Sequence, residues 1–167
     1  LANGARNHGT AGLFVSFEER EADLLKNFAF LPINVHELCQ EKRLDILSMI
    51  ISEEDITVAG EFNLLALLMR LDASLKQIGA KRLVIDSIDA LFASFPESHS
   101  IRFELQRIFR HLKERGVTTI VTSERGDNRL TRHGVEEYIS DCVILLDHRV
   151  FEQISKRRLR VIKYRGS

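Results

Sequence analysis

The chain has 167 residues, of which 44% are hydrophobic and 29% are charged, a composition typical of one folded domain and not of a disordered chain. Lys and Arg together number 24, and Asp and Glu together also number 24, so the formal net charge is zero. That balance argues against a protein whose main activity is to coat nucleic acid or an anionic membrane.

The two cysteines, Cys39 and Cys142, lie far apart and have no Cys or His neighbour at metal-ligand spacing. A zinc site or a disulfide framework is therefore not expected, and a reducing cytoplasm is the predicted compartment. No apolar run is long enough for a transmembrane helix, and the first six residues lack the features of a signal peptide. The missing initiator Met suggests a piece of a longer protein.

Compact runs of apolar and β-branched residues predict strands at 12–17, 46–51, 82–86, 117–122 and 142–146. Between them, apolar residues recur at spacings of three and four over 64–78 and 101–112, which predicts helices that end at Gly79 and Gly116. Strands that alternate with helices indicate an α/β fold with a parallel sheet, because parallel strands need a crossover connection.

Two segments depart from this alternation. Residues 52–61 are polar and acidic and are interpreted as a connecting loop. Residues 149–165 alternate apolar with basic side chains and, together with 142–146, predict a late hairpin at the edge of the sheet.

Acidic residues follow several predicted strands, at the edge where open α/β sheets bind ligands. Glu18 and Glu19 follow the first strand, and their mutual repulsion would suit one of them to act as a general base; helix capping is the simpler reading of the pair taken alone. Asp86 ends the 82–86 strand and has the form of a Walker-B aspartate, although a helix cap fits it equally well by itself. Ser123 and Glu124 follow the strand at 117–122.

Near the C-terminus, Lys163, Tyr164 and Arg165 place two cations at alternate positions, so both would face the same side of a strand. Such a pair suits a phosphate clamp that acts on a neighbouring subunit. The alternative is a solvated basic edge that discourages aggregation.

Several motifs are absent from the chain. It has no G-x-x-x-x-G-K-[ST] phosphate loop, no G-x-G-x-x-G and no G-x-S-x-G, and its six histidines form no ligand pair at helical spacing. Within these residues, nothing would grip the phosphates of a nucleotide by a glycine-rich loop.

The ordered set of segments resembles a KaiC-type ATPase domain of the RecA-like P-loop superfamily over nearly the whole chain. The segments are GLFVSFEE, KRLVIDSIDALF, FRHLKERGVTTIVTSERG, LTRHGVEEYISDCVILLDHR and RRLRVIKYRGS. The resemblance implies a three-layer fold, with helices on both faces of a mostly parallel sheet. Since LANGARNHG resembles the end of the helix that follows the Walker-A loop, that loop is expected just upstream of Leu1, and residues 1–167 are expected to form one domain that is incomplete at both ends.

The resemblance also implies roles for individual residues. Glu18 and Glu19 match tandem catalytic glutamates, with Glu18 as the preferred base, and Asp86 matches the aspartate that supports Mg²⁺ through water. Ser123 and Glu124 lie where the family senses the γ-phosphate. Lys163, Tyr164 and Arg165 match the segment that reaches the ATP of the adjacent subunit, with Arg165 as the arginine finger.

The cofactors implied are ATP and Mg²⁺, and the implied assembly is a hexameric ring regulated by KaiB- or KaiA-like partners. Two departures qualify the resemblance. Glu137 and Tyr138 stand where the second KaiC domain carries its phosphorylated Ser-Thr pair, so autokinase activity is not expected of this domain. The 28–32 segment also differs from the family, which leaves the adenine contacts open.

Two other hypotheses remain beside the ATPase. One is a non-catalytic scaffold or signalling module with a RecA-like fold. The missing phosphate loop favours this hypothesis for residues 1–167 alone, and these residues by themselves are expected to be inactive as an ATPase. The other is a DNA-acting RecA relative, which the zero net charge and the lack of a basic groove with interspersed aromatic residues disfavour.

Overall fold

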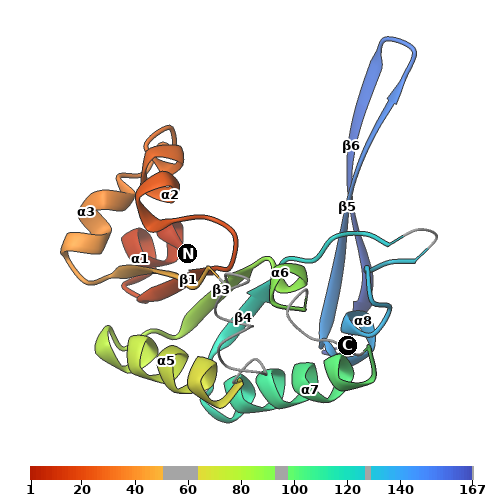
Figure 1. The fold of residues 1–167 in the computed structure, drawn as a ribbon. Helices are drawn as coiled ribbons and strands as arrows, with labels where there is room; N and C mark the ends of the chain where they lie inside the picture. Colours follow the sequence, from red (N-terminus) through yellow and green to blue (C-terminus); the bar gives the residue numbers. More distant parts are fainter. Residues whose placement is uncertain (51–63, 93–97, 127–128, 167) are drawn as a thin grey trace. The chain divides into compact units, whose positions relative to one another are not determined.

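The computed structural model describes residues 1–50, 64–92, 98–126 and 129–166, so the acidic segment at 52–61 lies outside the described residues (Figure 1). The chain divides into two compact units, Leu1–Glu124 and Arg125–Ser167. The first unit contains the parallel sheet and the second contains the late hairpin.

The first unit is built on four parallel strands in the order β2-β1-β3-β4. Their bounds are β1 (Gly12–Ser16), β2 (Leu44–Ser48), β3 (Arg82–Asp86) and β4 (Thr118–Val121). The register places Ser16 opposite both Ser48 and Asp86, so the carboxyl ends of three neighbouring strands meet along one edge. We call this the carboxyl edge of the sheet.

Helices flank this sheet on both sides, which confirms the predicted α/β class and is consistent with a RecA-like fold (Figure 1). Their bounds are α1 (Ala2–His8), α2 (Glu21–Phe28), α3 (Val35–Gln40), α5 (Leu64–Gln77), α6 (Ile88–Phe92) and α7 (Ser98–Glu114). In Figure 1, α1 to α3 lie on one side of the sheet, and α5 and α7 lie on the other. Within the described residues, no helix combines the length and the apolar character that crossing a membrane would require.

The inner strands are apolar on both faces because helices cover both. On one face, Leu13 and Val15 of β1 and Leu83 and Ile85 of β3 are fully buried, while on the other face Phe14 and Val84 are partly buried. On one side a cluster of buried side chains joins α1, α2, α3 and β2; its members are Ala5, Leu24, Val35, Leu38, Leu44 and Ile46. This burial of unbroken apolar runs is what fixes the sheet in the middle of the unit.

The predicted helix ends agree with the structure, and one predicted strand is shifted. Gly79 and Gly116 follow α5 and α7 with φ values of 62° and 65°, a left-handed conformation that ends a helix at little cost for glycine. The strand predicted at 46–51 is instead β2, which starts two residues earlier, at Leu44. Its register with β1, in which Gly12 pairs with Leu44, sets that start.

The second unit consists of α8 (Glu136–Ile139) and an antiparallel hairpin of β5 (Cys142–Phe151) and β6 (Ile154–Tyr164). The predicted hairpin is confirmed, and its first strand is longer than the predicted 142–146. Opposite residues share a face, so Leu159 and Val161 stand with Leu146 and Ile144, which accounts for the alternation of apolar and basic residues.

Candidate active site

Ser16 organises the turn at the end of β1. Its side chain is buried, and its Oγ accepts hydrogen bonds from the backbone N–H groups of Glu18 (3.3 Å) and Glu19 (2.9 Å). The chain then continues into α2, whose first residue is Glu21. Glu18 and Glu19 therefore lie before the helix, in a turn at the carboxyl edge, and neither one is the residue that caps it.

The two glutamates point to different partners. Glu18 Oε1 accepts a hydrogen bond from Ser87 Oγ at 2.8 Å, which directs this carboxylate toward the end of β3. Glu19 Oε2 accepts from Asn27 Nδ2 of α2 at 3.1 Å, and its backbone carbonyl accepts from Ser48 Oγ. Of the two exposed carboxylates, Glu18 is thus the one bonded to the residue that follows Asp86.

Asp86 is half-buried at the end of β3, next to the end of β4. Its Oδ1 accepts a hydrogen bond from Thr122 Oγ1, and no bond to its Oδ2 is found among the described residues. The Asp86–Ser87 peptide bond is cis. One carboxylate oxygen of Asp86 is therefore held by Thr122.

The end of β4 brings Ser123 and Glu124 to the same edge. The Glu124 N–H donates to Asp89 Oδ2 at 2.7 Å, and Ser123 Oγ lies 3.4 Å from the Glu124 carbonyl. Asp89 belongs to α6 and is only 5% exposed. The sequence reasoning did not single out Asp89, although an acid inside the apolar stretch IDALF was a signal that could have found it.

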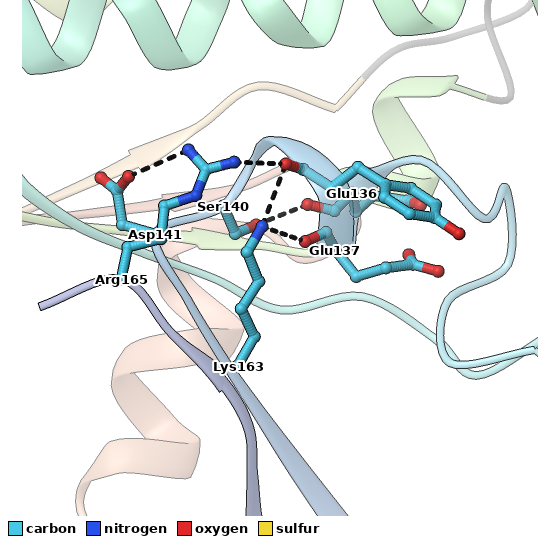
Figure 2. Close-up of polar contacts among 7 residues, drawn as sticks. Glu136, Glu137, Ser140, Asp141, Lys163 and Arg165 are labelled. Atoms are coloured by element: carbon cyan, nitrogen blue, oxygen red, sulfur yellow. Dashed lines mark hydrogen bonds and ion pairs between the residues drawn. The ribbon is translucent and has the colours of Figure 1, made fainter. Parts of the chain in front are cut away.

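Lys163 and Arg165 lie at the end of β6 in the second unit, and both bind the C-terminal end of α8 (Figure 2). Lys163 Nζ donates to the carbonyls of Glu137 (2.8 Å) and Tyr138 (3.0 Å), and Arg165 Nη2 donates to the same Tyr138 carbonyl at 2.8 Å. Because one carbonyl oxygen accepts from both cations, the two side chains lie side by side, as their alternate spacing predicted.

Asp141 provides a second anchor for Arg165. Its backbone carbonyl accepts the Arg165 N–H at 2.8 Å, and its carboxylate lies 3.5 Å from Arg165 Nη1 (Figure 2). A guanidinium carries five N–H donors and an ammonium three, so these contacts leave donors on both cations for an anion. Tyr164, between them, is 60% exposed.

The structure thus gathers the predicted site residues into two groups. The first group lies at or after the ends of neighbouring strands in the first unit and consists of Glu18, Glu19, Asp86, Ser123 and Glu124, while Lys163, Tyr164 and Arg165 belong to the second unit. The contacts that hold these residues were not predicted; they are made by the side chains of Ser16, Asn27, Ser48, Ser87, Asp89, Thr122 and Asp141. These contacts escaped notice because each is made by an ordinary polar residue whose partner is distant in the sequence or is a backbone group.

A comparison with known protein families shows to which family the chain belongs. The profile of the family described as ATPase: KaiC matches residues 1–167. The chain belongs to the KaiC ATPase family. The resemblance drawn from the sequence is therefore confirmed.

Curated relatives agree with this assignment. The chain is 42% identical over 167 residues to the circadian clock protein KaiC2 of Synechocystis sp., and all of it aligns with 29% of that protein. It is 36% identical over 169 residues to the circadian clock oscillator protein KaiC of Parasynechococcus marenigrum, covering 33% of it. The corresponding protein of Parathermosynechococcus lividus is 34% identical, with 31% covered. The chain spans about a third of the length of these relatives.

Proposed function

We propose that this KaiC-like chain is an ATP-hydrolysing domain that acts at the interfaces of a ring, with Glu18 as the general base. The observation that carries the proposal is the bond between Glu18 and Ser87, which holds one carboxylate of the tandem pair at the end of β3, at the residue that follows Asp86. A base must be held in place near the reacting atoms, and the register that sets Ser16 opposite Asp86 supports this role for Glu18 by bringing the ends of β1 and β3 together. The family assignment supplies the reaction class.

The donor set at the carboxyl edge fits Mg²⁺ chemically. Mg²⁺ binds carboxylate and water oxygens, and it is usually held by one or two carboxylates together with substrate phosphates. Asp86 offers one oxygen bonded to Thr122 and one without a bond among the described residues. When bound, Mg²⁺ would neutralise charge on the phosphates of ATP; Asp86 would hold it through water.

The chain's own residues would then do the following. Glu18 orients the attacking water and accepts its proton, while Ser123 and Glu124 contact the γ-phosphate region from the end of β4. Lys163, Tyr164 and Arg165 reach the nucleotide of an adjacent subunit, and Arg165 stabilises the charge that develops on the transferred phosphoryl group. Support for this last role comes from donor capacity, since Lys163 and Arg165 have more N–H donors than their contacts within the described residues use.

By the same proposal the assembly is a hexameric ring, and regulators similar to KaiB or KaiA are its partners. The relatives are named as circadian clock proteins, so a clock-related process is the proposed setting. The compartment proposed is the cytoplasm.

The test is the double substitution Glu18→Gln with Glu19→Gln in the full-length protein. Removing both carboxylates removes the base, so hydrolysis of radiolabelled ATP should fall to background while ATP still binds. The matched control is Glu21→Gln with Glu37→Gln, which removes two exposed carboxylates from the first turns of α2 and α3 and should leave turnover within a factor of about two. Undiminished turnover in the first variant would exclude the proposed base, whereas an absence of turnover in the unsubstituted full-length protein would favour the scaffold hypothesis.

A further inference from the structure

Asp89 is a buried acid for which the proposed reaction has no use. It lies in α6, three residues after Asp86, and is 5% exposed. Placing a carboxylate in such a position costs free energy unless hydrogen bonds compensate it. One such hydrogen bond is made by Asp89 Oδ2, which accepts the backbone N–H of Glu124 at 2.7 Å.

That bond continues the pairing of β3 with β4 beyond the point where β3 ends. The last regular contacts are the Thr122 N–H to the Ile85 carbonyl (3.0 Å) and the Ile88 N–H to the Thr122 carbonyl (3.1 Å). The chain then turns into α6, so its backbone no longer offers an acceptor to Glu124. The Asp89 carboxylate takes the place of the missing backbone carbonyl.

We propose that Asp89 is a positioning residue: its carboxylate fixes the direction of the Ser123–Glu124 segment, and through it the recognition of the γ-phosphate. This inference rests on the proposed function, because it needs Ser123 and Glu124 to face the nucleotide. Asp89 itself touches no reacting atom. It also links the chain after Asp86 to the chain after Thr122, so the two proposed contact points move together.

The first arm of the test needs no nucleotide. Amide hydrogen exchange at Glu124, followed by mass spectrometry or NMR, should be slow in the parent protein and at least about tenfold faster in Asp89→Ala, because the amide loses its acceptor. Asp89→Asn keeps an oxygen at the same reach and should keep exchange slow. Unchanged exchange in Asp89→Ala would overturn the proposal.

The second arm measures how strongly the full-length protein prefers a non-hydrolysable ATP analogue to ADP. Loss of a hydrogen bond to a charged acceptor should lower this preference roughly tenfold in Asp89→Ala, with ADP affinity unchanged. Asp89→Asn should restore the preference. A merely structural role would weaken the binding of the ATP analogue and of ADP by similar factors. That result, or an unchanged preference, would contradict the proposal.

Asp72→Ala is the matched control. Asp72 is also an aspartate with little exposed side chain, and it binds His111 and Arg115 at the end of α7 instead of a strand end. Its removal should change neither the Glu124 amide nor the nucleotide preference. If Asp89→Ala folds poorly, Asp89→Ser, which keeps a polar atom but shortens the reach, takes its place in both arms. Failure of the base assignment is detected separately, by the Glu18→Gln and Glu19→Gln variant.

Discussion

Ser16 illustrates how single polar side chains shape this KaiC-like domain. It lies at the end of the otherwise apolar strand β1, and its buried hydroxyl accepts hydrogen bonds from two backbone N–H groups. The turn that results points the two glutamate side chains in different directions, so that Glu18 accepts a hydrogen bond from Ser87 and Glu19 accepts one from Asn27. A tandem pair in the sequence thus becomes two carboxylates with different surroundings.

Cys39 carries a prediction at the same scale. Desolvation by burial, with smaller contributions from the carboxylates of Asp45 and Glu21, raises the pKa of the Cys39 thiol from 9.0 to about 11. Because the thiolate is the reactive form, iodoacetamide at pH 9 should label Cys39 about 50-fold more slowly in the native protein than in urea. Mass spectrometry of the peptide that contains Cys39 measures both rates, and equal rates would contradict the raised pKa.

The same shift predicts how stability depends on pH. Well below pH 9 the thiol is protonated in both the folded and the unfolded state and contributes no slope. Between pH 9 and about 11 the unfolded chain loses the proton that native Cys39 keeps, so the free energy of unfolding should fall as pH rises. Comparison of urea unfolding with a Cys39→Ser variant isolates this part of the slope.

At the scale of elements, α7 shows how one helix face fixes packing. Leu105, Ile108 and Leu112 are at most 1% exposed, while Phe103 is 71% exposed. The spacing of three and four residues that predicted the helix therefore also selected the buried face. Phe103, although more apolar in type than its neighbours, lies off that face.

The packing of α7 predicts unequal effects of two truncations. Leu105→Ala should lower the free energy of unfolding by about 2–5 kcal/mol, since it removes buried methyl groups and leaves a cavity. Phe103→Ala should change it by no more than about 0.5 kcal/mol, because its ring is largely in water. Urea denaturation followed by circular dichroism measures both, and a larger loss for Phe103→Ala would refute the assignment of faces.

Elements were predictable where one local pattern sufficed. The β3 strand has the predicted bounds, and α5 and α7 end where Gly79 and Gly116 indicated. The predicted start of β2 was wrong by two residues, because pairing with β1 and not local apolarity determines that the strand begins at Leu44. The short helices α6 and α8 were not predicted, since neither is long enough to show a helical period.

For the whole molecule, we expect the two groups of site residues to act on the same nucleotide from two adjacent subunits. Glu18 and Asp86 belong to one compact unit, and Lys163 and Arg165 belong to the other. A net charge of zero is compatible with this division of acids and cations. The extent of the domain, residues 1–167, and the hairpin's place at the sheet edge stay predictions.

Mixing subunits tests the arrangement in trans. Arg165→Ala alone should lower turnover by about 10³-fold, as expected for an arginine finger, and Glu18→Gln alone should also be inactive. In mixed rings an Arg165→Ala subunit keeps its base and receives Arg165 from a Glu18→Gln neighbour, so activity should return. The mixture should be assayed against each variant alone at equal total concentration. If mixing restores nothing although mixed rings form, the arrangement in trans is wrong.

By itself, the sequence determined the fold class, the family and which residues follow the strands, because these depend on periodicity and on ordered motifs within short stretches. Only the tertiary structure decided what each of those residues touches. The register of the parallel strands brings Glu18 to Ser87. The turn of the chain into α6 places the Asp89 carboxylate where it accepts the backbone N–H of Glu124. At the end of α8, Lys163 and Arg165 both donate to the Tyr138 carbonyl. These contacts join residues far apart in the chain, or bind backbone atoms whose positions no sequence pattern specifies.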